Sequence, residues 1–304
     1  MNRQTDIYFG KIMLFGEYSL ICNSMGLVVP FRSVSAKWDW MDQSEEVSFS
    51  LKSNTHLRDF HRFLETKADY CEMLDLSLMK QELETGLYFR STIPQGYGAG
   101  SSGALVAAVY QRYATDNTPR SVDDLRPFLA GMEAFFHGNS SGIDPISCYL
   151  GETVLIDENG NIRCIENPLS DTNTGIQVYL IDTKLPRETT KLMRHFEAQL
   201  HHYSFFKKLR DLFIPAVNQT IQHFRNGESD LFFEAMKTIS TFELNYFEPM
   251  VPDEMRSFWK QGADSANYFM KLCGSGGGGY LLVFTTDETS LQNIADNFEV
   301  IPLN

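Results

Sequence analysis

A glycine-rich segment at residues 94–104, PQGYGAGSSGA, has the residue types and spacing best suited to binding an anion. Alternating glycines let a backbone wrap closely around a phosphate because they carry no side chain. The segment opens onto a predicted helix, whose N-terminus offers unpaired N–H groups and a positive dipole end. No lysine follows the last glycine as in a P-loop, and the spacing differs from the dinucleotide-binding pattern. The alternative is a flexible turn in which Ser101 caps an ordinary helix.

A second polar segment, residues 133–144, begins and ends with a carboxylate. It leaves a predicted apolar helix at Glu133, passes through a glycine-containing turn and ends at Asp144. Two carboxylates and a hydroxyl that converge on one site would suit a hard cation such as Mg²⁺ bound to substrate phosphates. Alternatively, Glu133 is a solvated helix residue and Asp144 caps the element that follows.

A third segment, residues 271–284, contains the glycine run KLCGSGGGG. Flexible linkers join separate units, whereas this run lies between a predicted helical stretch and a strand near the end of the chain. We therefore expect a tight backbone turn that approaches either a ligand or the first glycine-rich segment.

The elements that must position these residues are strands and helices in mixed order. Aromatic and β-branched residues predict a hairpin at 152–165 and strands at 7–15, 27–49, 87–93, 176–183 and 280–285. Periodic apolar residues predict helices within 57–85, 101–115, 121–136 and 189–262, and one through Cys273. Since strands and helices do not alternate regularly, an α+β fold is favoured. The polar run 167–175 predicts a boundary between two domains, 1–168 and 169–304.

Lys11 lies in the otherwise apolar strand predicted at residues 7–15. A lysine in such a strand is either a surface residue whose stem covers apolar groups or a cation held at a site. The residues alone leave both interpretations open.

Composition excludes several classes of function. The 304 residues include 26 Lys and Arg against 39 Asp and Glu, and the net charge of −13 repels nucleic acid and anionic membranes. The apolar run at residues 12–15 is too short for a signal peptide or a membrane span. Five cysteines at uneven spacing form no C-x-x-C pair and indicate free thiols in a cytoplasmic protein. We expect no nucleic-acid or membrane partner, and either a monomer or a homodimer.

Taken together and in this order, the motifs resemble those of the GHMP small-molecule kinases. They are the glycine-lysine start of GKIMLFGEY at 10–18, the G-x-G-x-G-S-S loop, the H-G-N-x-S-G-x-D string at 137–144 and the late glycine run. Within that superfamily, the string at 137–144 and DTKLPRET at 182–189 are most similar to mevalonate kinases. The resemblance implies an N-terminal α+β domain, a C-terminal ferredoxin-like domain, ATP as co-substrate and Mg²⁺ as cofactor.

The resemblance also implies a role for individual residues. Asp144 would face the acceptor hydroxyl beside Lys11, and Ser102 and Glu133 would hold Mg²⁺. An ammonium group near Asp144 would stabilise negative charge, and phosphoryl transfer depends mainly on alignment and charge neutralisation. The ATP phosphates would be bound by Gly96, Gly98, Ala99, Gly100, Ser101 and Ser102. The small-molecule acceptor would be bound by Glu17, Tyr18, Gly274, Ser275 and Gly276.

The acceptor implied first is mevalonate, phosphorylated to 5-phosphomevalonate for isoprenoid precursor synthesis. The chain departs from the mevalonate kinase pattern at Tyr18 in place of His, at Ser140 in place of Pro and at Gly103 in place of Ala. Gly-Glu-Tyr is commoner in phosphomevalonate kinases, so a phosphomevalonate kinase or another GHMP kinase is the alternative. A decarboxylase on the same fold and a ligand sensor without turnover are further alternatives.

Overall fold

The structure is a computed structural model that describes residues 7–41, 47–186 and 189–303. Two positions of the predicted string at 182–189, residues 187 and 188, therefore lie outside the described residues. The chain forms two compact units, and neither is a single stretch of sequence. Unit 1 consists of the described parts of 1–11, 30–95 and 99–152, and unit 2 consists of those of 12–29, 96–98 and 153–304. The first two strands each contribute residues to both units.

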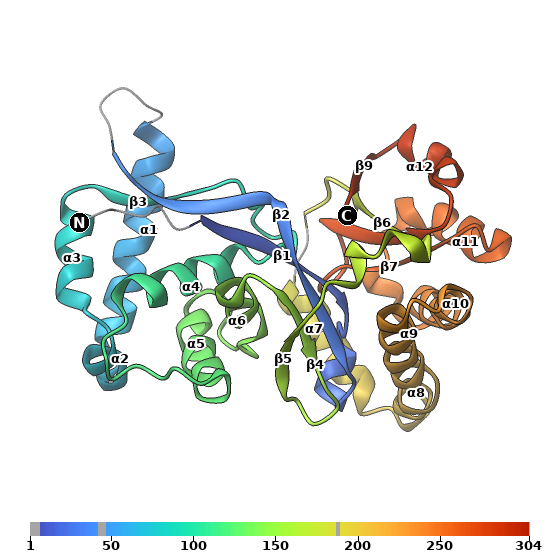
Figure 1. Cartoon of the computed structure of the whole chain (residues 1–304), viewed down its shortest axis with the longest axis horizontal. Helices are drawn as coiled ribbons and strands as arrows, with labels where there is room; N and C mark the ends of the chain where they lie inside the picture. Colours follow the sequence, from blue (N-terminus) through green and yellow to red (C-terminus); the bar gives the residue numbers. More distant parts are fainter. Residues whose placement is uncertain (1–6, 42–46, 187–188, 304) are drawn as a thin grey trace. The chain divides into compact units, whose positions relative to one another are not determined.

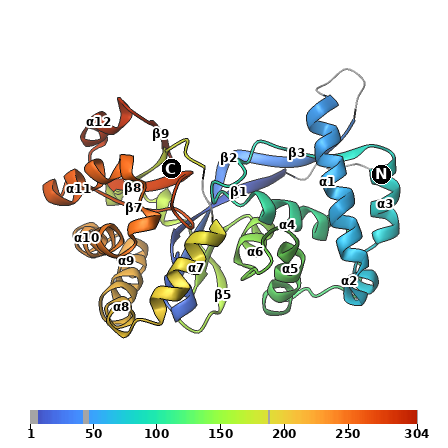
Figure 2. The same cartoon turned by 180° about the vertical axis from the view of Figure 1, so that it is seen from behind.

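In its described residues, unit 1 contains a strand pair and six helices. Strand β2 (Gly26–Trp40) pairs antiparallel with β3 (Leu87–Ser91), in the register Ala36↔Ser91 to Trp40↔Leu87. The start of β1 (Ile7–Phe15) also belongs to this unit. The helices are α1 (Val47–Glu65), α2 (Ala68–Met73), α3 (Leu76–Glu84), α4 (Ser101–Tyr113), α5 (Val122–His137) and α6 (Ile143–Leu150). Helices α4, α5 and α6 pack side by side, as Figures 1 and 2 show.

The sequence of α4 explains its central place in unit 1. All eight residues from Gly103 to Tyr110 are buried, because small Gly and Ala side chains let neighbouring elements approach on every side. Helix α5 begins at the predicted Ser121, whose side chain accepts a hydrogen bond from the Asp124 N–H. These two helices, which flank the predicted chemistry, confirm the helices predicted at 101–115 and 121–136.

Unit 2 is built around a four-stranded antiparallel sheet in the order β7-β8-β6-β9. Its strands are β6 (Gln177–Asp182), β7 (Tyr268–Leu272), β8 (Tyr280–Thr285) and β9 (Glu299–Pro302). Between β6 and β7 in the chain lie α7 (Thr189–Leu200), α8 (Tyr203–Lys208), α9 (Ile214–Asn226), α10 (Ser229–Tyr246) and α11 (Arg256–Ser265), and α12 (Gln292–Ala295) lies between β8 and β9. This strand order and connection are those of a ferredoxin-like domain, so the predicted fold class is confirmed.

The helices of unit 2 include α9 and α10, which pack side by side (Figure 2). The beginning of β2 pairs with β4 (Thr153–Ile156), and β4 pairs with β5 (Ile162–Ile165) in the predicted hairpin.

Two predicted elements are wrong. The strand predicted at 27–49 ends at Trp40, and Val47 already belongs to α1. The helix predicted through Cys273 is strand β7, whose five residues are all buried. The run YFMKL is interrupted only by Lys271, and so short a run shows no clear period that would distinguish a buried strand from a buried helix.

The predicted domains 1–168 and 169–304 remain a prediction, and the compact units follow a different partition because β1 and β2 pass through both of them. None of the helices among the described residues has the length and apolar composition needed to cross a membrane.

Candidate active site

The first glycine-rich segment has the backbone geometry of a loop that leads into a helix. Gly96, Gly98 and Gly100 have φ angles of +80°, +75° and +81°, which residues with a side chain rarely adopt. Gly100 is the N-cap of α4 and Ser101 is its first residue, so Ser101 is not the cap of an ordinary helix. The backbone N–H groups at the start of this 13-residue helix are the donors that the sequence predicts for a phosphate.

Lys11 is buried and forms an ion pair with Asp144. Its side chain rises from β1, only 4% of the residue is exposed, and Nζ lies 2.7 Å from Oδ1 of Asp144. The backbone N–H of Lys11 donates to the Ala99 carbonyl at 2.9 Å, which ties the strand to the glycine-rich loop. The interpretation of Lys11 as a surface residue is therefore wrong. Asp144 lies in the first turn of α6, where the positive helix dipole also stabilises its charge.

Glu133 is held at the same place by two hydroxyl groups. Ser102 Oγ donates to Glu133 Oε1 at 2.8 Å, and Ser140 Oγ donates to Oε2. Only 3% of Glu133 is exposed, which excludes a solvated helix residue. Burial, and then the nearby charge of Asp144, raise the pKa of Glu133 to about 7, although both serines and Lys11 act in the opposite direction.

This cluster has the donors that Mg²⁺ prefers and a deficit of positive charge. Two carboxylates and the Ser102 hydroxyl face one ammonium group, and a divalent cation would correct that imbalance. Among the described residues, no group of three or more His, Cys, Asp or Glu side chains could hold a metal alone. The donor set therefore suits a cation that takes its other ligands from phosphate and water, as Mg²⁺ commonly does.

Gly103 allows α4 to approach α6 closely at Asp144. A Cβ atom at position 103 would lie 2.8 Å from the carbonyl carbon of Asp144 and 3.0 Å from the backbone nitrogen of Pro145. Real Cβ atoms do not come so close to backbone atoms, so the absence of a side chain at Gly103 sets the position of the Asp144 backbone.

We expect Gly103→Ala to displace Asp144 from Lys11 without changing any charge. A displacement below 1 Å of a reacting group can lower a rate by about 10-fold or more, so turnover should fall by about that factor. Steady-state kinetics checks this result, and the nucleotide Kd should stay within about twofold. An unchanged kcat in a folded variant would contradict the proposed packing role.

Two predicted acceptor-binding residues of unit 2, Glu17 and Tyr18, hold the second glycine run. Glu17 forms a buried ion pair with Lys271, with Oε2 2.7 Å from Nζ, and its Oε1 accepts the Gly274 N–H at 3.2 Å. Tyr18 OH donates to the Ser275 carbonyl at 2.6 Å. The structure thus brings Glu17, Tyr18, Gly274 and Ser275 together through internal contacts, and their role toward a substrate stays a prediction.

The second glycine run approaches the first one, as predicted. A Cβ atom at Gly279 would lie 3.0 Å from the Cα of Tyr97. The Tyr97 and Tyr280 rings meet edge to face with their centroids 4.9 Å apart. Gly276, the last predicted acceptor-binding residue, has a φ of +68°, and a side chain there would collide with the Met250 carbonyl. The run is therefore a packed turn and not a linker.

Glu243 is a buried carboxyl group in the same network that the sequence does not reveal. Its Oε2 accepts the Leu272 N–H at 2.7 Å from within α10. Burial raises the pKa of Glu243 to about 8, while Lys271 and the Leu272 N–H lower it and Glu17 raises it.

We expect the stability of the fold to decrease as the pH rises from 5 to 8. The folded protein keeps a proton on Glu243 that the unfolded chain, with an ordinary pKa near 4.5, has already lost. Rising pH therefore favours unfolding by on the order of 1 kcal/mol per pH unit. Urea unfolding of Glu243→Gln should have a flatter pH profile, with Glu234→Gln on the exposed face of α10 as the control. Parallel profiles for wild type and Glu243→Gln would contradict this expectation.

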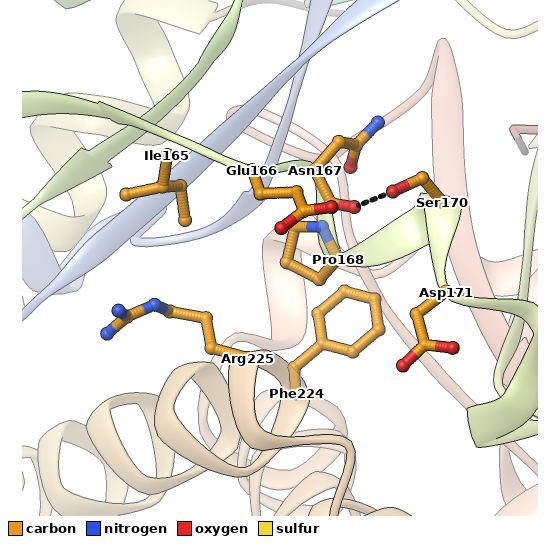
Figure 3. A pocket seen from close by; sticks show the side chains of 8 residues that line it. All are labelled: Ile165, Glu166, Asn167, Pro168, Ser170, Asp171, Phe224 and Arg225. Carbon is orange, nitrogen blue, oxygen red and sulfur yellow. Dashed lines mark hydrogen bonds between the residues drawn. The ribbon is translucent and has the colours of Figure 1, made fainter.

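A separate hollow of about 490 Å³ lies in unit 2, between the end of β5 and the end of α9 (Figure 3). The rings of Pro168 and Phe224 face each other there, while Glu166 and Arg225 lie at its exposed edge. It contains none of the residues that the sequence predicts for a site.

Three residues that take part in these networks are not predicted from the sequence. Ser140 contacts Glu133, and its only signal is a departure from the resembled string. Lys271 has the signal of a charged residue before a glycine run, although its partner Glu17 lies 254 positions away. No pattern in the sequence distinguishes Glu243 from the other acidic residues of α10, which are exposed.

Comparisons with known proteins find a family model that matches part of the chain and a relative of similar sequence. A family model described as the GHMP kinases N terminal domain matches residues 66–152. The D-glycero-alpha-D-manno-heptose 7-phosphate kinase of Campylobacter jejuni is 24% identical over 228 residues, which are 71% of this chain. The match spans 65% of that relative, slightly less than two thirds of its length.

Two solved structures share the fold over nearly the whole chain. The L. major mevalonate kinase in complex with R-mevalonate has a TM-score of 0.64 at 16% identity and covers 97% of this chain and 91% of its own. The Streptococcus pneumoniae phosphomevalonate kinase in complex with phosphomevalonate and AMPPNP has a TM-score of 0.63 at 13% identity. That match covers 98% of this chain and 99% of the phosphomevalonate kinase chain. The predicted resemblance is confirmed, by sequence for the N-terminal domain and by fold for the chain.

Proposed function

We propose that this chain, whose residues 66–152 match a family model described as the GHMP kinases N terminal domain, is an ATP-dependent small-molecule kinase that transfers a phosphoryl group from ATP to an alcohol. Mevalonate is the first candidate acceptor. The observation that carries the proposal is the buried Lys11–Asp144 ion pair, next to the Ser102–Glu133 hydrogen bond and the start of α4. A fold alone does not require these four polar side chains to meet.

Each residue of this cluster has a task in such a reaction. The acceptor oxygen attacks the terminal phosphorus of ATP, the bond to the ADP oxygen breaks, and the hydroxyl proton moves to Asp144. Lys11 places positive charge beside Asp144 and the developing charge on the transferred group. The N–H groups at the start of α4 bind the phosphates.

Ser102 and Glu133 are the residues that would hold Mg²⁺. When bound, the cation neutralises phosphate charge. The Ser102 oxygen can offer a lone pair to the cation while its O–H donates a hydrogen bond to Glu133, so the hydrogen bond of 2.8 Å is compatible with this role. The carboxylate of Glu133 contributes its negative charge from a buried position, where electrostatic interactions are strong.

The identity of the acceptor has two candidates, each supported by its own observation. Mevalonate is supported by the string at 137–144 and by the fold shared with the mevalonate kinase. A sugar phosphate is supported by the 24% identity to the heptose 7-phosphate kinase. Both reactions phosphorylate a hydroxyl and use the same cluster.

A panel of acceptors tests the proposal. The purified chain is incubated with ATP and Mg²⁺ and with mevalonate, phosphomevalonate, free sugars or a heptose 7-phosphate, and ADP, CO₂ and phosphorylated product are measured. We expect one ADP for each phosphorylated acceptor and no CO₂. Release of CO₂ would indicate a decarboxylase, and binding of nucleotide and acceptor without ADP release would indicate a sensor. Either result would overturn the proposed kinase activity.

A further inference from the structure

Ser140 connects the turn before α6 to the Glu133 carboxylate. Its hydroxyl donates to Glu133 Oε2 and accepts the Gly142 N–H at 2.9 Å. A hydroxyl group can donate only one hydrogen bond. The Ser140 oxygen accepts the Gly142 N–H, and its single O–H donates to the Glu133 carboxylate. The direction of the hydrogen bond to Glu133 is therefore determined by the turn.

The turn itself is held by α5, the helix that carries Glu133. Arg126 Nε donates to the Ser141 carbonyl at 2.8 Å. Gly142 has a φ of +73° and serves as the N-cap of α6. Ser140 thus lies on a short, well-anchored segment, and its contact with Glu133 is a fixed feature of unit 1.

The Glu133 carboxylate is consequently held at both oxygens. Ser102 donates to Oε1 from the start of α4, and Ser140 donates to Oε2 from the turn before α6. A glutamate side chain has three rotatable bonds, and one hydrogen bond leaves rotation of the carboxylate plane possible, whereas two suppress it. Mg²⁺ demands nearly ideal ligand geometry, so a ligand that is already oriented loses less freedom on binding.

We propose that Ser140 is a positioning residue that orients the Glu133 carboxylate toward the metal of a bound metal–nucleotide complex. The inference rests on the proposed function, because it assigns Glu133 to that metal. It goes beyond the resemblance, since proline is usual at position 140 in the mevalonate kinase string and a proline has no hydroxyl. Ser140 touches neither nucleotide nor acceptor in this assignment, and it acts through Glu133 alone.

The test compares nucleotide affinity with and without metal, using calorimetry on the full chain. Wild type should bind Mn²⁺–ADP more tightly than ADP in excess chelator. Loss of a residue that orients a metal ligand typically costs about 10-fold in metal affinity. Ser140→Ala should therefore weaken Mn²⁺–ADP binding by about 10-fold and leave metal-free ADP binding within about twofold. Ser140→Thr keeps the hydroxyl and should restore wild-type affinity.

Ser121→Ala is the matched control, because it removes the N-cap of the same helix without touching Glu133. It should lower the thermal midpoint and leave both affinities unchanged, which separates a structural effect on α5 from a positioning effect. An affinity for Mn²⁺–ADP within twofold of wild type in Ser140→Ala would overturn the inference alone. A wild type that binds neither form of ADP would overturn the proposed function, and the inference with it.

Discussion

Asp144→Asn should lower kcat by about 10²–10⁴-fold while the KM for ATP changes little. The substitution keeps the size and shape of the side chain but removes its charge and its ability to take a proton. The Asp144 side chain is 35% exposed, so it can face an acceptor. The side chain of its partner Lys11, whose Nζ lies 2.7 Å from Asp144 Oδ1, is almost fully buried. The N–H groups at the start of α4, which are proposed to bind the phosphates, are not altered, so ATP affinity should persist.

The control for this variant is Asp123→Asn, an exposed aspartate in the first turn of α5. Both variants remove one acidic residue from the start of a helix, so both should lose about 1 kcal/mol or less through the dipole. Asp144→Asn also leaves Lys11 without its partner carboxylate, and its thermal midpoint should fall further. A normal kcat together with a lowered midpoint would show that Asp144 is a structural cap and would refute the catalytic role.

The sequence predicts the cluster of unit 1 well because its chemistry is local. Ser101 and Ser102 follow alternating glycines, and Glu133 and Asp144 lie on either side of one turn, so each feature can be recognised within about a dozen residues. Lys11 is recognised only through the resemblance, since a single lysine in an apolar strand has an ordinary surface explanation. In the structure only 4% of Lys11 is exposed, which excludes the surface explanation.

The predictions fail where the physical cause is long-range. Strand β7 is buried over all five residues, and only its pairing with β8 decides between strand and helix. The contact between Glu17 and Lys271 joins residues 254 positions apart, and no spacing rule reports such a pair. Gly103 is a similar case. A glycine is needed there only because α6 packs so closely that a Cβ at position 103 would lie 2.8 Å from the carbonyl carbon of Asp144.

The two polar clusters also differ in what their charges do. In unit 1 the charged side chains hold one another and leave Asp144 partly exposed, as a reacting group requires. In unit 2, Glu17 and Lys271 have side chains 4% and 2% exposed, and each also forms a hydrogen bond to a backbone group of the second glycine run. We therefore expect the second cluster to affect mainly folding.

Lys271→Met should destabilise unit 2 by about 3–5 kcal/mol, because it leaves the buried Glu17 carboxylate without a cation. Methionine fills a similar volume, so lost packing contributes little. The Leu272 carbonyl, which accepts from Lys271 Nζ at 2.5 Å, also loses its donor. Urea unfolding at constant pH measures the change. The control is Lys260→Met on the exposed face of α11, whose free energy of unfolding should stay within about 0.5 kcal/mol of wild type.

A double variant separates the ion pair from a role of Glu17 toward the acceptor. If the cost of Lys271→Met comes from the unpaired charge, adding Glu17→Gln should recover more than half of it, because a neutral amide needs no cation and can still accept the Gly274 N–H. If Glu17 also binds the acceptor, Glu17→Gln alone should raise the KM for the acceptor, in addition to the destabilisation that follows from leaving Lys271 without its carboxylate. A destabilisation below about 1 kcal/mol for Lys271→Met would contradict the buried ion pair as the support of the second glycine run.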